Sequence, residues 1–468
     1  MNERQVLIRG GVIVDAQGLR REDLRIRAGR IVDTAPQIPL EAADELIEAS
    51  GSVVMPALAD PHTHLRVPGD EEAETLVTGT MAGALGGYGA LLAMPNTRPA
   101  LDGPSSVRQL LTAAQKMPVH VLAAGTITKD RQGKELSPFA GLRSAGVRIV
   151  TDDGSGVQDA NIMRRALQYC DELGLIVAQH AEDASLFAYG VMNEGPLSSN
   201  LGLAGIPAAA EEVMVARDIE LARSTGAHVH FLHLSTVRSA QLVARAKRDG
   251  IAVTAEVTPH HLIMQDALLQ GYDPLFKVNP PLRAEADRAG LWEYVAEGVF
   301  DVVGTDHAPH ATWKKDAPLD SAAFGMLGLQ HALAAMWTGA LACVDRGLAP
   351  AVPSEIAAAA ALAARAEPWL SEAEGCWLWR LASMMSWKPA ALIGAAELAS
   401  GTLRTGDMGS VVIFDPAHRW SPRADSIVSK AGNSPWLGRE LIGKVSDLFI
   451  AGRRLVADGQ LVLEGNWQ

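Results

Sequence analysis

Cysteine is scarce in this chain: the 468 residues include three, far apart at Cys170, Cys343 and Cys376. An odd number of widely spaced cysteines argues against a disulfide framework and against a cysteine-based zinc site. We therefore expect buried free thiols in a reducing compartment, which predicts a cytoplasmic protein.

Long apolar runs and an excess of positive charge are also missing. No run approaches the roughly 18 uninterrupted apolar residues of a membrane span, and the start, MNERQVLIRGG, lacks the apolar region of a signal peptide. With 41 Lys and Arg against 54 Asp and Glu, the net charge is −13. This balance argues against nucleic acid and against an anionic membrane surface as partners, so we expect a small-molecule ligand.

Both ends of the chain carry short β-rich runs separated by glycine turns. One such region is 5–33, and a similar texture returns in GDMGSVVIFDP and DLFIAGRRLVADGQLVL near the C-terminus. Runs of this kind are typical of meandering antiparallel strands. We predict that 1–55 and 402–468 together build one small β-sandwich domain, and that 56–401 forms a separate unit.

The middle of the chain repeats the order strand, loop, helix. Helical stretches such as 157–173, 209–224 and 236–249 separate apolar runs, and uninterrupted apolar runs indicate strands buried on both faces of a parallel sheet. Eight such units predict an α/β fold, a (β/α)₈ TIM-type barrel. A doubly wound sheet is the alternative, but no G-x-G-x-x-G opens the first helix. The predicted strands are 52–58, 89–95, 119–125, 147–152, 175–180, 228–234, 251–257 and 300–306.

The segment 341–388 is rich first in alanine and then in tryptophan. Apolar residues at helical spacing predict packed helices. Aromatic residues also favour subunit interfaces, so an alternative is that the tryptophans line one. The residues concerned are Trp369, Trp377, Trp379 and Trp387.

Polar side chains follow several of the predicted strands. His62 and His64 stand two positions apart and therefore face the same side of an extended chain; Arg66 follows on that side if the extension persists. A barrel brings the C-terminal ends of its strands into one ring, where the active site forms. Imidazoles and carboxylates gathered there suit Zn²⁺, and their number suits two metal ions. The strand-end residues are His62, His64, Asp152, Asp153, His180, His233, Asp306, His307 and His310.

Ordered motifs along nearly the whole chain resemble the amidohydrolase superfamily and, within it, the bacterial class I dihydroorotases. The motifs are DPHTHLRVPG, AMPNTRP, TDDGSGVQDA, QHAED, LHLST, AEVTPHHL, NPPLR, GTDHAPH and FG at 324–325.

The resemblance implies a binuclear zinc site. It makes His62 and His64 ligands of one zinc with Asp306 beside them, gives His180 and His233 to the second, and bridges the two with Asp153. Many binuclear amidohydrolases use a carbamylated lysine as the bridge. This chain has no lysine between Lys134 and Lys247, so either an aspartate bridges instead or the second metal is held weakly. Asp153 rather than Asp152 matches the family position of the bridge.

The resemblance also implies a substrate site. Arg66, Asn96 and His310 would hold the substrate carboxylate, and His64 would lie at the substrate as well as at the metal. Asn279, with the backbone around Phe324 and Gly325, would contact the pyrimidine ring.

The implied reaction is the reversible cyclisation of N-carbamoyl-L-aspartate to (S)-dihydroorotate in pyrimidine (UMP) biosynthesis, with Asp306 as general base and then general acid. Alternatives are another cyclic amidohydrolase (hydantoinase, dihydropyrimidinase or allantoinase) and a non-catalytic partner of aspartate transcarbamoylase. We expect a homo-oligomer, and an association with aspartate transcarbamoylase stays open. Residues 310–323 predict a mobile lid, with an ordinary surface loop as the alternative.

Overall fold

Eight parallel strands form a closed ring in the computed structural model, which describes residues 5–187 and 189–462. Two hydrogen-bonded runs, β8 to β10 and β11 to β17, meet at parallel bridges between Gly125 and Val150 and between Thr63 and His307. Every neighbouring pair is parallel, so the ring is the predicted barrel. Its strands are β8 (Leu58–Thr63), β9 (Tyr88–Ala93), β10 (His120–Ala123), β11 (Ile149–Thr151), β12 (Ile176–Gln179), β15 (Val229–Phe231), β16 (Val253–Val257) and β17 (Val302–Val303).

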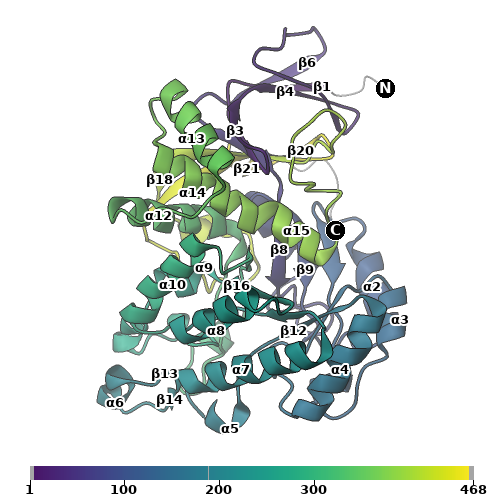
Figure 1. Cartoon of the computed structure of the whole chain (residues 1–468), viewed down its shortest axis with the longest axis vertical. Helices are drawn as coiled ribbons and strands as arrows, with labels where there is room; N and C mark the ends of the chain where they lie inside the picture. Colours follow the sequence, from purple (N-terminus) through teal and green to yellow (C-terminus); the bar gives the residue numbers. More distant parts are fainter. Residues whose placement is uncertain (1–4, 188, 463–468) are drawn as a thin grey trace.

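Helices follow the barrel strands and cover the outside of the ring (Figure 1). The three helices predicted from the sequence are confirmed. Among them, α4 (Ala160–Leu173) begins after Asp159, whose side chain accepts hydrogen bonds from the amides of Asn161 and Ile162. It ends at Gly174, which has a left-handed φ of 64°. The main helices are α1 (Leu76–Leu85), α2 (Pro104–Ala114), α3 (Phe139–Ser144), α4 (Ala160–Leu173), α7 (Ala208–Thr225), α8 (Val237–Arg248), α10 (Glu285–Glu297) and α12 (Ala332–Asp345).

Short elements occupy the loops between these units. They are α5 (Ala184–Phe187), β13 (Met192–Asn193), α6 (Pro196–Leu201), β14 (Gly205–Ile206), α9 (Pro259–Ile263) and α11 (Thr312–Lys315).

Strands from both ends of the chain form two further sheets above the barrel in Figure 1. One has the order β5-β4-β1-β6 and the other β21-β20-β19-β18-β7-β2-β3. Val6 and Ile26 of the first sheet share an apolar core with Ile13, Ile413 and Phe449 of the second, as in a β-sandwich. The strands are β1 (Gln5–Arg9), β2 (Val12–Asp15), β3 (Gly18–Arg21), β4 (Asp23–Arg27), β5 (Arg30–Ala35), β6 (Asp44–Glu48), β7 (Val53–Pro56), β18 (Val411–Trp420), β19 (Leu441–Ile450), β20 (Arg453–Ala457) and β21 (Gln460–Leu461).

The division of the chain at 55 and 402 stays a prediction, and its outermost ranges, 1–4 and 463–468, lie outside the described residues. The prediction that 52–58 is the first barrel strand is wrong. Val53 and Val54 pair with Phe414 and Ile413 of β18 in the sandwich, and the barrel strand β8 begins only at Leu58. One apolar run serves two sheets in succession, so hydrophobicity alone gives no signal of the change.

The alanine- and tryptophan-rich segment forms packed helices as predicted, α13 (Ser354–Ala366) and α14 (Glu372–Ala382), and α15 (Lys388–Ile393) begins at its last residue. Helix α13 packs against α14 and against β3 of the sandwich. Trp377 is fully buried with its ring edge-on to Trp292, 5.5 Å between centroids, whereas Trp369, Trp379 and Trp387 are half-buried. Packing within the chain therefore accounts for Trp377.

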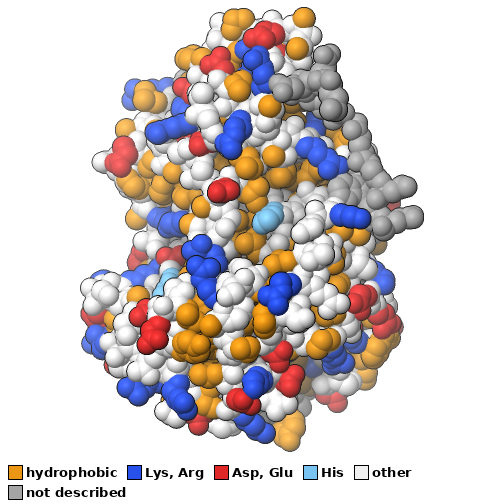
Figure 2. Space-filling view, turned by 90° about the vertical axis from the view of Figure 1, so that its right-hand side faces the viewer, with side chains coloured by type: hydrophobic (Ala, Val, Ile, Leu, Met, Phe, Trp, Pro, Cys, Tyr) orange, Lys and Arg blue, Asp and Glu red, His pale blue; other side chains and the backbone are white. Residues whose placement is uncertain are grey.

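The described residues contain no helix with the length and apolar character needed to cross a membrane. Basic and acidic side chains are interspersed over the face shown in Figure 2.

Candidate metal centre and active site

Six residues predicted as metal ligands come together at the C-terminal ends of the barrel strands, and all are buried. His62 lies within β8, and the other five lie one to three residues beyond the ends of β8, β11, β12, β15 and β17. We call this set the histidine–aspartate cluster. It comprises His62, His64, Asp153, His180, His233 and Asp306.

Asp153 lies between two pairs of imidazoles. Its Oδ2 atom is 3.6 Å from Nε2 of His62 and 3.4 Å from Nε2 of His64, while its Oδ1 atom is 3.5 Å from Nδ1 of His180 and 3.6 Å from Nε2 of His233. Each pair forms, with Asp153, a three-residue group whose ligand atoms lie within 4.8 Å of one another. One carboxylate thus faces two candidate metal positions.

Asp306 completes the first group. Its Oδ1 atom lies 3.0 Å from Nε2 of His64 and 3.5 Å from Nε2 of His62. Burial alone would raise the pKa of Asp306, but the charges of His62 and the hydrogen bond from His64 lower it well below its usual range. The pKa of Asp153 is lowered in the same way, against burial, by His62 and by hydrogen bonds from His180 and His233. Both aspartates are therefore ionised at neutral pH.

The donor atoms of the cluster suit a divalent metal. Nδ1 of His180 lies 3.0 Å from Nε2 of His233, and the buried Nε2 of His62 has no hydrogen-bond partner among the described residues. Two of the ligand-bearing residues, His233 (φ 30°) and Asp306 (φ 44°), adopt left-handed backbone conformations that cost energy for residues other than glycine. Converging imidazoles, ionised carboxylates and a constrained backbone define a metal site.

Arg66 lies near the cluster, although not by continuing the extended strand. Its φ of 59° is left-handed, so the alternation of His62 and His64 ends before it. Its Nε atom donates to the carbonyl of Pro309 at 3.1 Å, and Nη2 lies 3.4 Å from Nε2 of His310. The His310 Nε2 atom donates in turn to the carbonyl of Phe324 at 2.6 Å. Arg66 and His310 are thus neighbours, and their role in holding the substrate carboxylate stays a prediction.

Asn279, Phe324 and Gly325 line a cavity of ≈ 160 Å³ together with cluster residues. The Asn279 amide donates to Oε2 of Glu182 at 3.1 Å and lies 3.4 Å from Nε2 of His180. Their predicted contacts with a pyrimidine ring stay predictions. The cavity nevertheless opens directly onto Asp153, His180, His233 and Asp306.

Asn96 is placed against the cluster itself. Its Oδ1 atom accepts from Nδ1 of His64 at 2.9 Å, and its Nδ2 atom donates to Oδ2 of Asp153 at 3.2 Å. Asn96 therefore orients His64, a contact that the sequence analysis did not foresee, and its role toward the substrate stays a prediction.

Two buried carboxylates near the cluster were missed. Glu256 accepts a hydrogen bond from Nδ1 of His62 at 2.9 Å, and Asp60 accepts from the amides of His62 and Thr305. Each is the one acidic residue of its buried barrel strand, which is a usable signal because a buried carboxylate needs partners. Burial raises the pKa of Asp60 to about 6 despite its hydrogen bonds.

Other polar residues near the strand ends have structural partners, and His307 among them lies 3.3 Å from Oε2 of Glu74. Both oxygens of Asp152 accept hydrogen bonds from the 127–128 loop, so Asp152 holds that loop. His261 contacts Thr258 and the carbonyl of Pro280. Oε2 of Glu182 lies 3.6 Å from Nε2 of His180, so this carboxylate supports the cluster.

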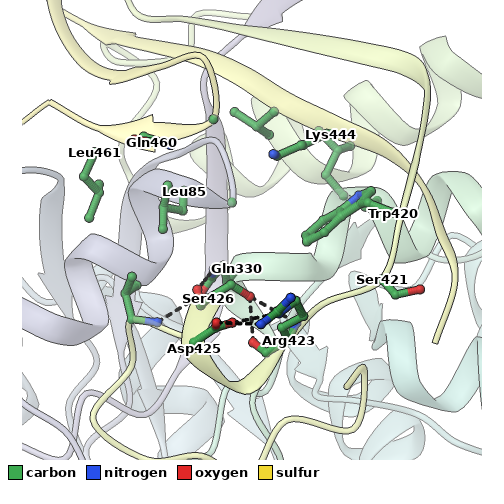
Figure 3. A pocket seen from close by; sticks show the side chains of 16 residues that line it. Leu85, Gln330, Trp420, Ser421, Arg423, Asp425, Ser426, Lys444, Gln460 and Leu461 are labelled. Atoms are coloured by element: carbon green, nitrogen blue, oxygen red, sulfur yellow. Dashed lines mark hydrogen bonds and ion pairs between the residues drawn. The ribbon is translucent and has the colours of Figure 1, made fainter. Parts of the chain in front are cut away.

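A separate hollow of ≈ 500 Å³ lies between the barrel and the sandwich (Figure 3). Trp420 and Lys444 stand on one side of it and Leu85 and Leu461 on the other, while Arg423 pairs with Asp425 below. None of the described residues that line it belongs to the histidine–aspartate cluster.

The barrel, the sandwich and the cluster at the strand ends together describe a barrel protein with a buried candidate metal site. The structure is similar to L-hydantoinase from Arthrobacter aurescens, with a TM-score of 0.82 at 22% identity, covering 98% of this chain and 97% of that one. It is also similar to dihydropyrimidinase from Brevibacillus agri, with a TM-score of 0.78 at 21% identity, covering 98% and 96%. At these identities the likeness shows the fold alone.

Sequence relatives are more specific. Residues 51–239 match the family described as dihydro-orotase-like. The chain is 40% identical over 456 residues to the dihydroorotase of Pelotomaculum thermopropionicum, covering 97% of this chain and 99% of the relative. It is 39% identical over 460 residues to that of Streptomyces coelicolor, covering 98% and 99%. The chain belongs to the dihydroorotase family, and it is a metal-binding hydrolase as predicted.

Proposed function

We propose that this chain catalyses the reversible cyclisation of N-carbamoyl-L-aspartate to (S)-dihydroorotate in pyrimidine biosynthesis, using two zinc ions. Full-length relatives with the name dihydroorotase support the reaction. The observation that carries the binuclear site is the position of Asp153, whose two carboxylate oxygens face different pairs of imidazoles.

The cluster would hold two metals in a definite arrangement. His62, His64 and Asp306 would bind the first zinc, His180 and His233 the second, and Asp153 would bridge them. Strand β11 carries no lysine that could replace this bridge. Zinc bound there would polarise the ring carbonyl and lower the pKa of the attacking water toward about 7.

The proton transfers fall to Asp306. In the hydrolytic direction this carboxylate takes a proton from the attacking water and passes it to the leaving ring nitrogen, as general base and then general acid. Its lowered pKa keeps it ionised and able to accept that proton at neutral pH. Biosynthesis runs the same steps in reverse.

Binding of the substrate falls to two sets of groups. Arg66 presents charged N–H donors suited to the substrate carboxylate, with His310 3.4 Å from its Nη2 atom and Asn96 beside His64. Asn279, Phe324 and Gly325 would contact the ring from the cavity that opens onto the cluster. The carboxylate contact distinguishes dihydroorotate from uncharged cyclic amides.

Zinc content and dihydroorotate turnover, measured on the same samples, test the proposal. We expect about two zinc ions per wild-type chain, and at most one in Asp153→Ala, with turnover lowered at least about 100-fold because the bridge is lost. Asp152→Ala is the matched control, since this neighbouring buried aspartate contacts the 127–128 loop instead. It keeps both zinc ions. Full zinc content and turnover in Asp153→Ala would contradict the bridging role.

Two further assays separate the alternative functions, which the relatives do not favour. Turnover of hydantoin or allantoin above that of dihydroorotate would favour another cyclic amidohydrolase. An empty site in zinc-replete protein would favour a non-catalytic partner of aspartate transcarbamoylase. A homo-oligomer, the association with aspartate transcarbamoylase and the cytoplasmic location stay predictions. Light scattering of the purified chain, alone and mixed with that enzyme, tests the first two.

A further inference from the structure

Glu256 lies beneath the histidine–aspartate cluster, on barrel strand β16, and its side chain is fully buried. Its Oε1 atom accepts hydrogen bonds from Nδ1 of His62 at 2.9 Å and from the backbone amide of His233 at 3.1 Å. Its Oε2 atom lies 3.7 Å from Nε2 of His230. A buried carboxylate in this position is costly unless such partners compensate it.

The contact with His62 fixes which nitrogen of that imidazole is free. A carboxylate oxygen can only accept, so Nδ1 of His62 carries the hydrogen. Nε2, the other ring nitrogen, faces Asp153 and Asp306 at 3.6 and 3.5 Å, and in the neutral ring it carries the lone pair that a metal ion would take. Partners of this kind hold a metal-binding imidazole in one tautomer and one orientation.

The contact with His233 acts on the backbone. His233 has a φ of 30°, a conformation that persists only where the surroundings hold it. The amide that donates to Glu256 is the amide of this constrained residue. One carboxylate oxygen therefore contacts a ligand residue of the first three-residue group and a ligand residue of the second.

The Glu256 carboxylate packs directly against Gly304, where a side chain would leave no room for it. A Cβ atom built on Gly304 would lie 2.2 Å from Cδ, 2.4 Å from Oε2 and 2.6 Å from Oε1 of Glu256. Such distances are far inside van der Waals contact, so any larger residue at position 304 must displace the carboxylate. An alanine here perturbs Glu256 without removing a charge or a hydrogen-bonding group.

We propose that Glu256 is a positioning residue that orients the ligands of both metal positions at once, through the His62 side chain and the His233 backbone. The inference rests on the proposed metal-dependent function and deepens it. It predicts that weakening this one carboxylate lowers the affinity for both metals together rather than for one.

Zinc affinity in chelator buffers and the visible spectrum of the cobalt-substituted protein test this inference. We expect Glu256→Gln and Gly304→Ala each to weaken binding of both metals by about 10–100-fold and to alter the cobalt spectrum, since outer partners of metal ligands have effects of this size. The control is Asp15→Asn, which removes a buried charge that contacts Arg20 and the amide of Leu403 in the sandwich. This variant keeps wild-type affinity and spectrum, even if its unfolding temperature falls.

Several outcomes would overturn the inference. Wild-type affinity and spectrum in both Glu256→Gln and Gly304→Ala would refute the positioning role, and loss of only one metal would refute the joint role. If Glu256→Gln does not fold, Gly304→Ala decides, because it keeps the carboxylate. A wild-type protein without bound metal would overturn the proposed function and this inference with it, whereas metal-loaded wild type with unaffected variants would overturn this inference alone.

Discussion

The guanidinium of Arg66 lies 3.4 Å from the imidazole of His310, between Nη2 and Nε2, although 244 residues separate them in the chain. The His310 Nε2 atom carries a hydrogen, because its partner at 2.6 Å is the carbonyl oxygen of Phe324, which can only accept. Burial, and then the charge of Arg66, lower the pKa of His310 to about 3, so the ring is neutral. The charged guanidinium of Arg66 thus lies beside the cluster and next to a neutral imidazole, an arrangement that favours an anion.

Replacing Arg66 tests whether that anion is the substrate carboxylate. We expect Arg66→Lys to raise the KM for dihydroorotate about 10-fold, because lysine keeps only one of the two charged hydrogen bonds that arginine can donate to the carboxylate. Arg66→Ala loses both and should raise the KM about 100-fold or more, since each such bond contributes about 1.5–3 kcal/mol. Steady-state kinetics at saturating zinc measure this effect. Zinc content serves as the control and stays at the wild-type value. An unchanged KM in Arg66→Ala would remove Arg66 from the substrate site.

The barrel and the ligand ring were predictable because both follow from rules that act along the chain. Uninterrupted apolar runs indicate strands buried on both faces, and the residues just beyond their ends must meet at one mouth. His62 and His64 share a side by strand alternation alone. The position of the other four ligands could be predicted on the single assumption that the strands close into a ring. The bridge between Thr63 and His307 confirms that closure. These ligands are Asp153, His180, His233 and Asp306.

What the sequence did not predict depends on contacts between distant residues. Arg66 has a left-handed backbone, so its approach to His310 follows from the loop after β8 and not from alternation. Glu256 contacts His62 from β16, two strands away around the ring and 194 positions along the chain, and no local pattern specifies that pairing. The change of sheet between Pro56 and Leu58 could not be predicted from the sequence either, because both sheets require apolar residues there.

The stability of the protein should depend on pH through Lys315, a buried residue of α11. Burial, and then the charge of Lys277, lower the pKa of Lys315 from 10.5 to about 7. Between pH 7 and 10.5 the unfolded chain keeps this proton while the folded chain releases it, so stability rises with pH across that window. The gain is up to about 1.4 kcal/mol per pH unit.

Urea unfolding of wild type and Lys315→Met at pH 7, 8 and 9 measures this dependence. We expect the wild-type free energy of unfolding to rise with pH relative to that of the variant, because methionine has no proton to release. Metal binding adds a pH dependence common to both proteins, so the difference between them isolates Lys315. Parallel pH profiles would show that Lys315 titrates near its ordinary pKa.

Trp377 should stabilise the chain itself and not a contact between subunits. It is fully buried, packs edge-on to Trp292 and donates from Nε1 to the carbonyl of Leu348 at 3.0 Å. We expect Trp377→Ala to lower the free energy of unfolding by about 3–5 kcal/mol, the usual cost of such a cavity. Leu362→Ala on neighbouring α13 is the control, since that side chain is 63% exposed and its loss costs little. Denaturant unfolding and light scattering measure both effects. A changed subunit number in Trp377→Ala without loss of stability would favour the interface interpretation.

The segment 310–323, predicted to be a lid, contacts the rest of the structure through surface residues on one side and through a buried residue on the other. At its outer side Trp313 donates to Glu72 at 2.9 Å and Lys314 pairs with Asp70, both near the surface. At its inner side the buried Nζ of Lys277 donates to the carbonyls of Leu319 and Asp320, and it also lies 4.3 Å from the centre of the Phe324 ring. The outer contacts are the weak ones, since exposed ion pairs contribute little.

Limited trypsin digestion with and without dihydroorotate tests the lid. We expect the substrate to slow cleavage after Lys314, because closure over the cavity orders the outer contacts, and Lys277→Met to speed cleavage by releasing the inner ones. Cleavage after Arg423, in an exposed loop away from the cluster, provides the internal control and should not respond to substrate. Equal cleavage rates after Lys314 in the presence and absence of dihydroorotate would leave 310–323 an ordinary surface loop, held in place by Lys277 whether or not substrate is bound.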